Sequence, residues 1–204
     1  MPDSIIEELA NLPATCISDA MGGFTTMDYT IKPLSTPSVI GRAFTVKITK
    51  GQNREFLRAL KSASPGDVIV VDAEGDTTRA IAGDFVLRMA KTLGIKGVVV
   101  DGVIRDITGI QELDFPIFAK GTTANAGLKS DEGILSVPIS CGGVAVSNGD
   151  IIVGDKDGVV VIPQRNEVEV LARAKEKMKK DLIRDEKVSG NIDEIHKYID
   201  SMLN

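Results

Sequence analysis

A short run of β-branched residues, closed by glycine at both ends, constrains the fold of this chain most. It covers residues 97–102 (Gly-Val-Val-Val-Asp-Gly), and such a run favours a strand buried on both faces over a helix. In the segment before it, residues 85–93, apolar residues recur at the three- and four-residue spacing of an amphipathic helix, and Gly94 follows. The pattern predicts a helix followed by a buried strand, as in an α/β fold.

Charged residues flank this predicted helix and strand. Gly83 and Asp84 precede the helix, with Asp84 as the predicted N-cap, and Arg105 and Asp106 follow the strand. In open α/β layers, ligands bind where strands end and helices begin, because the first N–H groups of a helix are free to bind anions. Two carboxylates and a guanidinium in these places indicate a metal site. The structural alternative is a helix cap together with a buried ion pair that braces the loop.

The rest of the chain alternates short strands with helices. Strands are predicted at residues 41–48, 68–71, 117–119, 134–137, 144–146, 151–153 and 159–162. Helices are predicted near residues 5–9, 16–21 and 56–60, and charged amphipathic helices at 166–185 and 191–203. Residues 25–40 are predicted to be loop, and Asp157-Gly158 indicates a tight hairpin. We therefore expect a layered α/β fold with flanking helices instead of a doubly wound sheet.

Length and charge limit the domain organisation and the partners. A chain of 204 residues with 43% hydrophobic content can bury a core of one domain, residues 1–204, with 166–204 as a C-terminal helical arm. This arm has either a solvated face or a face that packs on a neighbouring subunit. The net charge of −5 indicates no nucleic-acid partner, and no apolar run approaches the roughly 20 residues of a membrane span. We expect a soluble, cytoplasmic protein in which Cys16 and Cys141 are buried small hydrophobes without a chemical role.

Five motifs in order resemble one known family. They lie at residues 41–46 (Gly-Arg-Ala-Phe-Thr-Val), 66–72 (Gly-Asp-Val-Ile-Val-Val-Asp), 83–84 (Gly-Asp), 97–106 (ending in Val-Ile-Arg-Asp) and 149–163 (containing Asp-Gly-Val-Val-Val-Ile-Pro). Together they resemble the RraA-like family, which contains 4-hydroxy-4-methyl-2-oxoglutarate aldolases and regulators of ribonuclease E activity A. The resemblance implies an α/β domain of the swivelling β/β/α type, assembled as homotrimers or dimers of trimers with active sites between subunits.

The resemblance also implies roles for the charged residues. Asp106 is the expected ligand of a divalent ion, Mg²⁺ or alternatively Mn²⁺, whose remaining positions are filled mostly by water. Asp84 is expected to act on this ion through water. Arg105 is expected to lie against the keto or enolate oxygen of the substrate, where its fixed charge offsets the developing negative charge.

The start of the predicted helix completes the expected substrate site. Gly83 and the backbone N–H groups of Phe85, Val86 and Leu87 are expected to hold the carboxylate of a 2-keto acid. The polar loop at residues 121–131 is a further candidate for the mouth of the cleft.

The implied activity is that of a metal-dependent (class II) aldolase that cleaves short 2-keto acids to pyruvate. Retro-aldol cleavage of 4-hydroxy-4-methyl-2-oxoglutarate and decarboxylation of oxaloacetate can both proceed through a metal-stabilised enolate. A water is the expected base, since His196 lies in a polar terminal helix. A Schiff-base mechanism would need a desolvated lysine, for which Lys47 and Lys120 are the candidates. The alternative function is a non-catalytic regulator that binds a ribonuclease or another protein partner.

Overall fold

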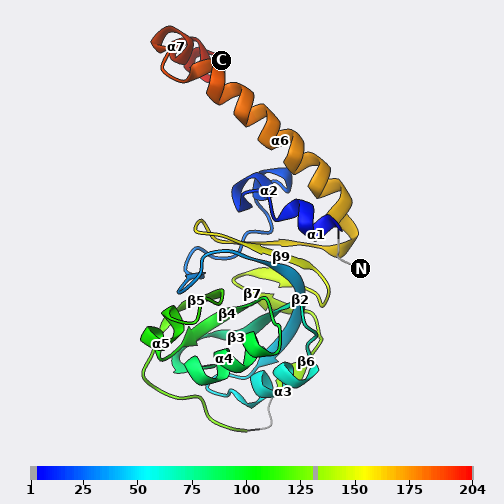
Figure 1. Cartoon of the computed structure of the whole chain (residues 1–204), viewed down its shortest axis with the longest axis vertical. Helices are drawn as coiled ribbons and strands as arrows, with labels where there is room; N and C mark the ends of the chain where they lie inside the picture. The colour runs from blue at the N-terminus through cyan, green and yellow to red at the C-terminus, as the bar shows by residue number, and fades with distance from the viewer. Residues whose placement is uncertain (1–3, 131–132, 204) are drawn as a thin grey trace.

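In the computed structural model, which describes residues 4–130 and 133–203, a compact arrangement of strands and short helices carries a long projecting helix near its C-terminus (Figure 1). The helices are α1 (Ser4–Leu9), α2 (Ala14–Ala20), α3 (Arg54–Ser62), α4 (Asp84–Thr92), α5 (Ile107–Gln111), the 3₁₀ helix η1 (Gln164–Asn166), α6 (Glu167–Val188) and α7 (Ile192–Leu203). The helices predicted at 85–93, 166–185 and 191–203 are thus confirmed as α4, α6 and α7, with ends that differ by a few residues.

Eight strands of the described chain form one mixed sheet. The strands are β1 (Lys32–Pro33), β2 (Val39–Ile48), β3 (Asp67–Ala80), β4 (Gly97–Ile104), β5 (Ile117–Thr122), β6 (Gly133–Leu135), β9 (Ile151–Gly154) and β10 (Val159–Ile162), and a separate pair is formed by β7 (Ile139–Cys141) and β8 (Val144–Val146). The order is β1-β5-β4-β3-β2-β9-β10, and β6 pairs with the end of β2. Because β2, β3, β4 and β5 run parallel, their carboxyl ends lie along one edge of the sheet.

Strand β4 is the centre of the core, as its β-branched sequence predicts. All eight of its residues are buried. Val98 and Val100 pack in the cluster that includes residues of α3, α4 and α5, whereas Val99 packs in the cluster that includes residues of β7 and β8. Alternate side chains of one strand therefore fill the two sides of the sheet, which explains why the segment is apolar without a break. The expected layered α/β fold is confirmed.

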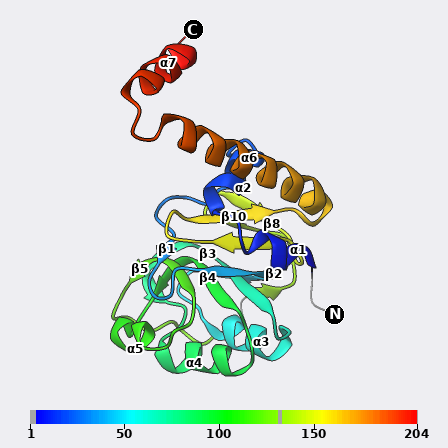
Figure 2. The same cartoon turned by 45° about the horizontal axis from the view of Figure 1, so that its top comes forward.

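A third cluster joins the two ends of the chain. Leu9 and Ile17 of the first two helices pack with Val170 and Leu171 of α6 against β9 and β10. Figure 2 shows α6 crossing this side of the molecule and continuing past it toward α7. Only the first part of α6 therefore contributes to the core.

Several expected boundaries were wrong. Residues 25–40 were predicted as loop, but they contain β1 and the start of β2, and Thr26 forms a bridge with Val160. The strand at 68–71 continues to Ala80, and neither α5 nor β7 was predicted. These segments are short or polar, so whether they form a strand or a helix depends on contacts with residues distant in sequence. Local periodicity does not report such contacts.

The minor expectations agree with the structure. Cys16 and Cys141 are both buried and free, and burial raises the pKa of each thiol, that of Cys141 well above its usual range. His196 is exposed on α7. The hairpin at Asp157-Gly158 joins the antiparallel strands β9 and β10. Among the described helices, none combines the length and the apolar character that crossing a membrane requires.

Candidate active site at the carboxyl ends of β3 and β4

Two adjacent parallel strands bring the predicted site residues together. Strand β3 pairs with β4 up to Ala80 opposite Val103, and the ladder continues beyond both strands. The N–H of Ile81 donates to the Val103 carbonyl over 2.9 Å, and the N–H of Arg105 donates to the Ala82 carbonyl over 3.0 Å. These bonds hold the β3–α4 connection beside the β4–α5 connection. The predicted pairs, residues 83–84 and 105–106, are therefore neighbours in space although 20 residues separate them in sequence.

Gly83 is in contact with the Asp106 carboxylate. A Cβ atom built on Gly83 would lie 2.2 Å from Asp106 Oδ2 and 3.2 Å from Arg105 Nε. Every other residue type would displace the carboxylate or the guanidinium, since real Cβ atoms do not approach other heavy atoms this closely. Glycine leaves room here for two functional groups to lie against its backbone, and its φ of −115° is not left-handed.

Asp106 adopts a backbone conformation that aspartate visits but most residues avoid. Its φ of 64° and ψ of 43° are left-handed, and it is the N-cap residue of α5. Its side chain is 45% exposed, and its Oδ2 lies 3.4 Å from Arg105 Nε. Such backbone outliers concentrate at functional sites, where the surrounding structure holds them in place. The carboxylate is both accessible and beside a fixed positive charge.

Asp84 is placed by the start of α4 and by α5. Its Oδ1 accepts a 2.6 Å hydrogen bond from the N–H of Phe85, and its Oδ2 lies 3.9 Å from a guanidinium nitrogen of Arg88. A Cβ atom on Gly109 would lie 2.7 Å from Asp84 Oδ2, so α5 also needs a glycine at this contact. The prediction that Asp84 is the N-cap was wrong by one residue. Gly83 is the N-cap residue and has an extended backbone, and Asp84 is the first residue of the helix. The Asp84 carboxylate accepts its hydrogen bond from the N–H of Phe85, the residue that follows it.

Two of the three expected backbone donors already have partners. The N–H of Phe85 donates to Asp84, and the N–H of Leu87 donates to the Gly83 carbonyl over 3.1 Å. The side chain of Leu87 is fully buried in the core. Val86 therefore carries the helix-start N–H that best fits the expected role.

A cavity of about 420 Å³ opens beside these residues. Its lining comes from α3, the β3–α4 connection, α4, the β4–α5 connection and the loop after β5, and includes Asn53, Leu57, Gly83, Phe85, Val86, Met89, Arg105 and Lys129. Arg105 therefore lies at both the carboxylate and the cavity. Asp84 and Asp106 are not among the lining residues, but Asp106 contacts Gly83 and Arg105, which are.

The loop predicted as the mouth of the cleft contributes to this lining. Ala126, Gly127 and Lys129 all border the cavity. Asp131, at the end of the predicted loop, lies outside the described residues. The loop therefore supplies a second cation, Lys129, to the same cavity as Arg105.

Sequence reasoning missed Asn53. It precedes α3, yet its side chain makes no cap hydrogen bond, and its Oδ1 is buried without a partner in the described structure. Leaving a buried acceptor without a hydrogen-bond partner costs free energy. Because Asn53 lines the cavity, its Oδ1 is a candidate to accept a hydrogen bond from a ligand there. The only local signal was an Asn before a helix, which ordinarily indicates a cap.

The donor set fits a hard divalent ion that keeps its waters. Among the described residues, no group of three or more His, Cys, Asp or Glu side chains converges as a full ligand set would. Asp106 and Asp84 offer carboxylate oxygens, which suit Mg²⁺, an ion that commonly takes one or two carboxylates and completes its shell with water and substrate. The set does not fit structural zinc, which requires four nitrogen or sulfur ligands.

The lysines weighed for a Schiff base lie elsewhere. Lys120 Nζ is 2.5 Å from Asp101 Oδ1 in an ion pair, and Lys47 is exposed on β2. Neither is among the residues that line the cavity beside Arg105. Lys47 is solvent-exposed and Lys120 is engaged with Asp101, so neither has the desolvated, unpaired setting that a Schiff-base lysine needs.

Comparisons with known proteins point to one family. The sequence model described as RraA-like, Aldolase/RraA, matches residues 14–161. A Halalkalibacterium halodurans protein named "Putative 4-hydroxy-4-methyl-2-oxoglutarate aldolase" is 53% identical over 199 residues, covering 97% of this chain and 95% of that protein.

Solved structures agree with the sequence comparison. Streptomyces coelicolor RraAS2, described as an unusual member of the RNase ES inhibitor RraA family, superposes with a TM-score of 0.83 at 27% identity, covering 91% of this chain and 98% of that one. The RNA-processing inhibitor RraA from Thermus thermophilis gives a TM-score of 0.69 at 27% identity, covering 74% and 92%.

Proposed function

Because this chain belongs to the RraA-like family, we propose that it is a carbon–carbon lyase that cleaves short 2-keto acids to pyruvate. The proposed reactions are retro-aldol cleavage of 4-hydroxy-4-methyl-2-oxoglutarate and decarboxylation of oxaloacetate. One observation carries the proposal: the Asp106 carboxylate lies against the backbone of Gly83 and beside Arg105, and both of these residues line a cavity of a size that suits a small ligand. A site that only stabilised the fold would not need an accessible carboxylate in this position.

We propose that Asp106 holds a divalent ion, Mg²⁺ or Mn²⁺, and that Asp84 acts on it through water. When bound, such an ion polarises the keto group of a chelating substrate. The accessible carboxylates of both residues support this assignment, with side chains 45% and 35% exposed.

Arg105 is the residue that faces the reacting group. Its guanidinium lies at both the carboxylate and the cavity, so it can donate to the 2-keto oxygen as negative charge develops there. The backbone N–H of Val86, at the positive end of α4, can bind the substrate carboxylate. These two contacts would hold the 2-keto acid in one orientation.

The bond changes in the two reactions follow from this orientation. In the retro-aldol reaction, the 4-hydroxyl loses its proton to a water held by Asp84, and C4 becomes the keto carbon of one pyruvate. The electron pair of the C3–C4 bond passes to the 2-keto group, where Arg105 offsets its charge, and protonation at C3 gives the second pyruvate. In the decarboxylation, the same bond breaks with release of CO₂, and no base is needed.

A regulatory role is the second candidate function. The similarity to two solved structures favours it, since one is described as an RNA-processing inhibitor and the other as an unusual member of an RNase ES inhibitor family. In this alternative the chain would bind a ribonuclease through its oligomer surface. A homotrimer or a dimer of trimers is the proposed assembly for either function.

The test is pyruvate release from both substrates with Mg²⁺ or Mn²⁺, then with a chelator, after subtraction of the decarboxylation that the metal alone produces. Asp106→Asn is expected to abolish metal-dependent turnover. Glu112→Gln is the matched control, because Glu112 is an exposed carboxylate at the other end of α5. Wild-type protein that releases no pyruvate above the metal blank from either substrate would contradict the lyase and favour the regulator.

A further inference from the structure

Apolar side chains from two helices line the cavity at Arg105. Leu57 belongs to α3, and Phe85 and Met89 belong to α4; we call these three side chains the apolar wall. Phe85 and Met89 are about one helical turn apart, so they lie on the same face of α4. Arg105 and Lys129 supply positive charge from the β4–α5 connection and from the loop after β5. The cavity therefore combines an apolar wall on two helices with cations on two loops.

The wall is only partly buried by the rest of the described chain. Phe85 and Leu57 are 69% and 39% exposed, and neither belongs to a core cluster. Met89 packs against the main core cluster and so connects the wall to the fold. An exposed aromatic side chain gains stabilisation when an apolar group covers it. A ligand in this cavity would gain affinity from an apolar group placed on the wall.

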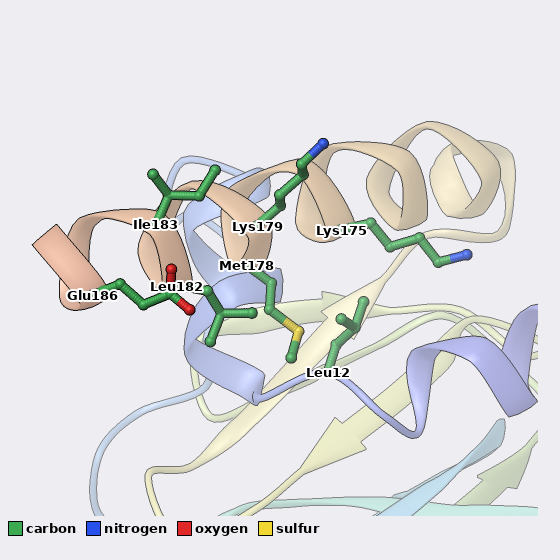
Figure 3. Close-up of a pocket in the computed structure, with 7 residues that line it drawn as sticks. All are labelled: Leu12, Lys175, Met178, Lys179, Leu182, Ile183 and Glu186. Carbon is green, nitrogen blue, oxygen red and sulfur yellow. The ribbon is translucent and has the colours of Figure 1, made fainter.

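A cavity of about 360 Å³ on the second half of α6 also has apolar side chains in its lining. Figure 3 shows Met178 and Leu182 pointing toward the side on which Leu12 lies. None of its lining residues is a candidate site residue. The cavity at Arg105 differs, because apolar side chains and candidate site residues line it together.

The proposed substrate contacts decide which part of a ligand meets the wall. The Val86 N–H and the Arg105 guanidinium are proposed to hold the carboxylate and the 2-keto oxygen, the groups on C1 and C2. In the proposed retro-aldol substrate, C4 carries a second carboxylate and an alkyl group. The carboxylate suits the side of Lys129, whereas the alkyl group gains by burial against Phe85, which precedes Val86 in α4.

We propose that the apolar wall selects substrates by the alkyl group on C4, and that Phe85 is its specificity-determining residue. The preferred substrates are 4-hydroxy-2-oxo diacids whose C4 carries an alkyl chain longer than methyl. The cavity of about 420 Å³ falls within the roughly 300–1,000 Å³ of sites for drug-sized ligands, so it has room for such a chain. This inference rests on the proposed lyase function and names its substrate class. Oxaloacetate has no alkyl group and is therefore expected to be a poorer substrate.

The bond changes are the same for every member of this class. The 4-hydroxyl loses its proton, the C3–C4 bond breaks, C4 becomes a keto carbon and C3 gains a proton. One product is always pyruvate, and the other is a 2-keto acid that keeps the C4 substituent. It is glyoxylate for hydrogen, a second pyruvate for methyl and 2-oxobutanoate for ethyl.

The first test compares kcat/KM for the substrates with hydrogen, methyl and ethyl on C4, with Mg²⁺ present and both keto acids measured by chromatography. Because burial of one methylene group strengthens binding roughly fourfold, wild type is expected to favour ethyl over hydrogen by about 16-fold. Phe85→Ala is expected to reduce this ratio to about fourfold or less, whereas Phe85→Leu keeps most of it. Phe24→Ala is the matched control and keeps the wild-type ratio, because Phe24 is 88% exposed and does not line the cavity.

The second test alters the wall without changing Phe85. Leu57→Asn puts a polar side chain of similar size in the wall and is expected to lower the ratio, whereas Leu182→Asn on α6 is not. Wild type that releases pyruvate with equal kcat/KM from all three substrates would overturn this inference and leave the lyase standing. The same holds if Phe85→Ala and Phe24→Ala give equal ratios. No pyruvate from any of the three would contradict the lyase, and this inference with it.

Discussion

Two regions of the chain differ in how far their residues are buried: the edge of the sheet at β3 and β4, and the helical arm formed by α6 and α7. Every residue of β4 is buried, whereas α7 buries none. At the strand edge, backbone and carboxylate are so close that Gly83 has no room for a methyl group. On the arm, apolar side chains face outward in a regular stripe. The comparison shows that strand pairing fixes the positions of the candidate site residues, whereas α7 buries no side chain in the described chain.

The largest expected effect tests the buried side of this comparison. Ile69→Ala in β3 removes a fully buried side chain from the main core cluster, and we expect a loss of about 2–5 kcal/mol in the free energy of unfolding. Val168→Ala, at an exposed position on α6, should change it by less than about 0.5 kcal/mol. Urea unfolding of both variants checks the prediction. Equal losses would mean that the arm is as tightly packed as the sheet.

The next effect is on turnover. Arg105→Ala removes the guanidinium beside Asp106, and we expect kcat for pyruvate release to fall about 10²–10³-fold, the range seen when one donor to a developing oxyanion is removed. Arg165→Ala is the matched control, because Arg165 is exposed on η1 and does not line the cavity. A similar loss in both variants would show that general positive charge, and not the position of Arg105, matters.

Gly83→Ala tests the close contact directly. The added methyl group would lie 2.2 Å from Asp106 Oδ2, so this exposed carboxylate must move, and we expect loss of turnover with less than about 1 kcal/mol of destabilisation. Combining it with Asp106→Ala removes the clash, so the destabilisation should be smaller in the double variant than the sum of the two single changes. Additive losses measured in urea would contradict the contact.

The smallest effect concerns pH. Burial raises the pKa of Asp76, but hydrogen bonds from Thr78 and from the Gly51 N–H outweigh it and lower that pKa below its usual value. A lowered folded-state pKa contributes stability above the unfolded-state pKa, and this contribution is lost as pH falls through the folded value. Asp76→Asn should therefore flatten the fall in stability below about pH 4, where free aspartate titrates.

The arm offers the matching comparison for pH. Hydrogen bonding with Lys177 lowers the pKa of Asp181, but this carboxylate lies on the surface of α6, where solvent screens such pairs. Asp181→Asn should leave the acid limb of the unfolding curve close to that of wild type. If the Asp181 variant changed the pH dependence of stability more than the Asp76 variant, the expectation that the sheet contributes more than the arm would be contradicted.

Local sequence predicted the continuous, strongly patterned elements well. Strand β4 and helices α4, α6 and α7 follow from apolar runs and helical spacing, since burial of one strand on both faces or of one helix face repeats along the chain. The extension of β3 to Ala80, the strand β7 and the helix α5 were missed. These segments are short or polar, and they pair with segments far away in sequence. Their structure therefore depends on that pairing, which the local residue pattern does not reveal.

The candidate site shows the same division. Gly83, Asp84, Arg105 and Asp106 were identifiable in sequence, because charged residues at the ends of a predicted helix and strand are unusual for a core. Asn53 and Gly109 were not, because an Asn before a helix and a Gly within a short helix have ordinary local explanations.

By itself, the sequence determined the continuous buried strands and amphipathic helices, the candidate residues of the site, and the family that the chain resembles. Only the tertiary structure decided that Asp106 lies against Gly83 and that Asp84 begins α4 instead of capping it. Periodicity and residue type act over a few neighbours along the chain. Contacts between the ends of adjacent parallel strands depend instead on strand register, which is set when distant segments pack together.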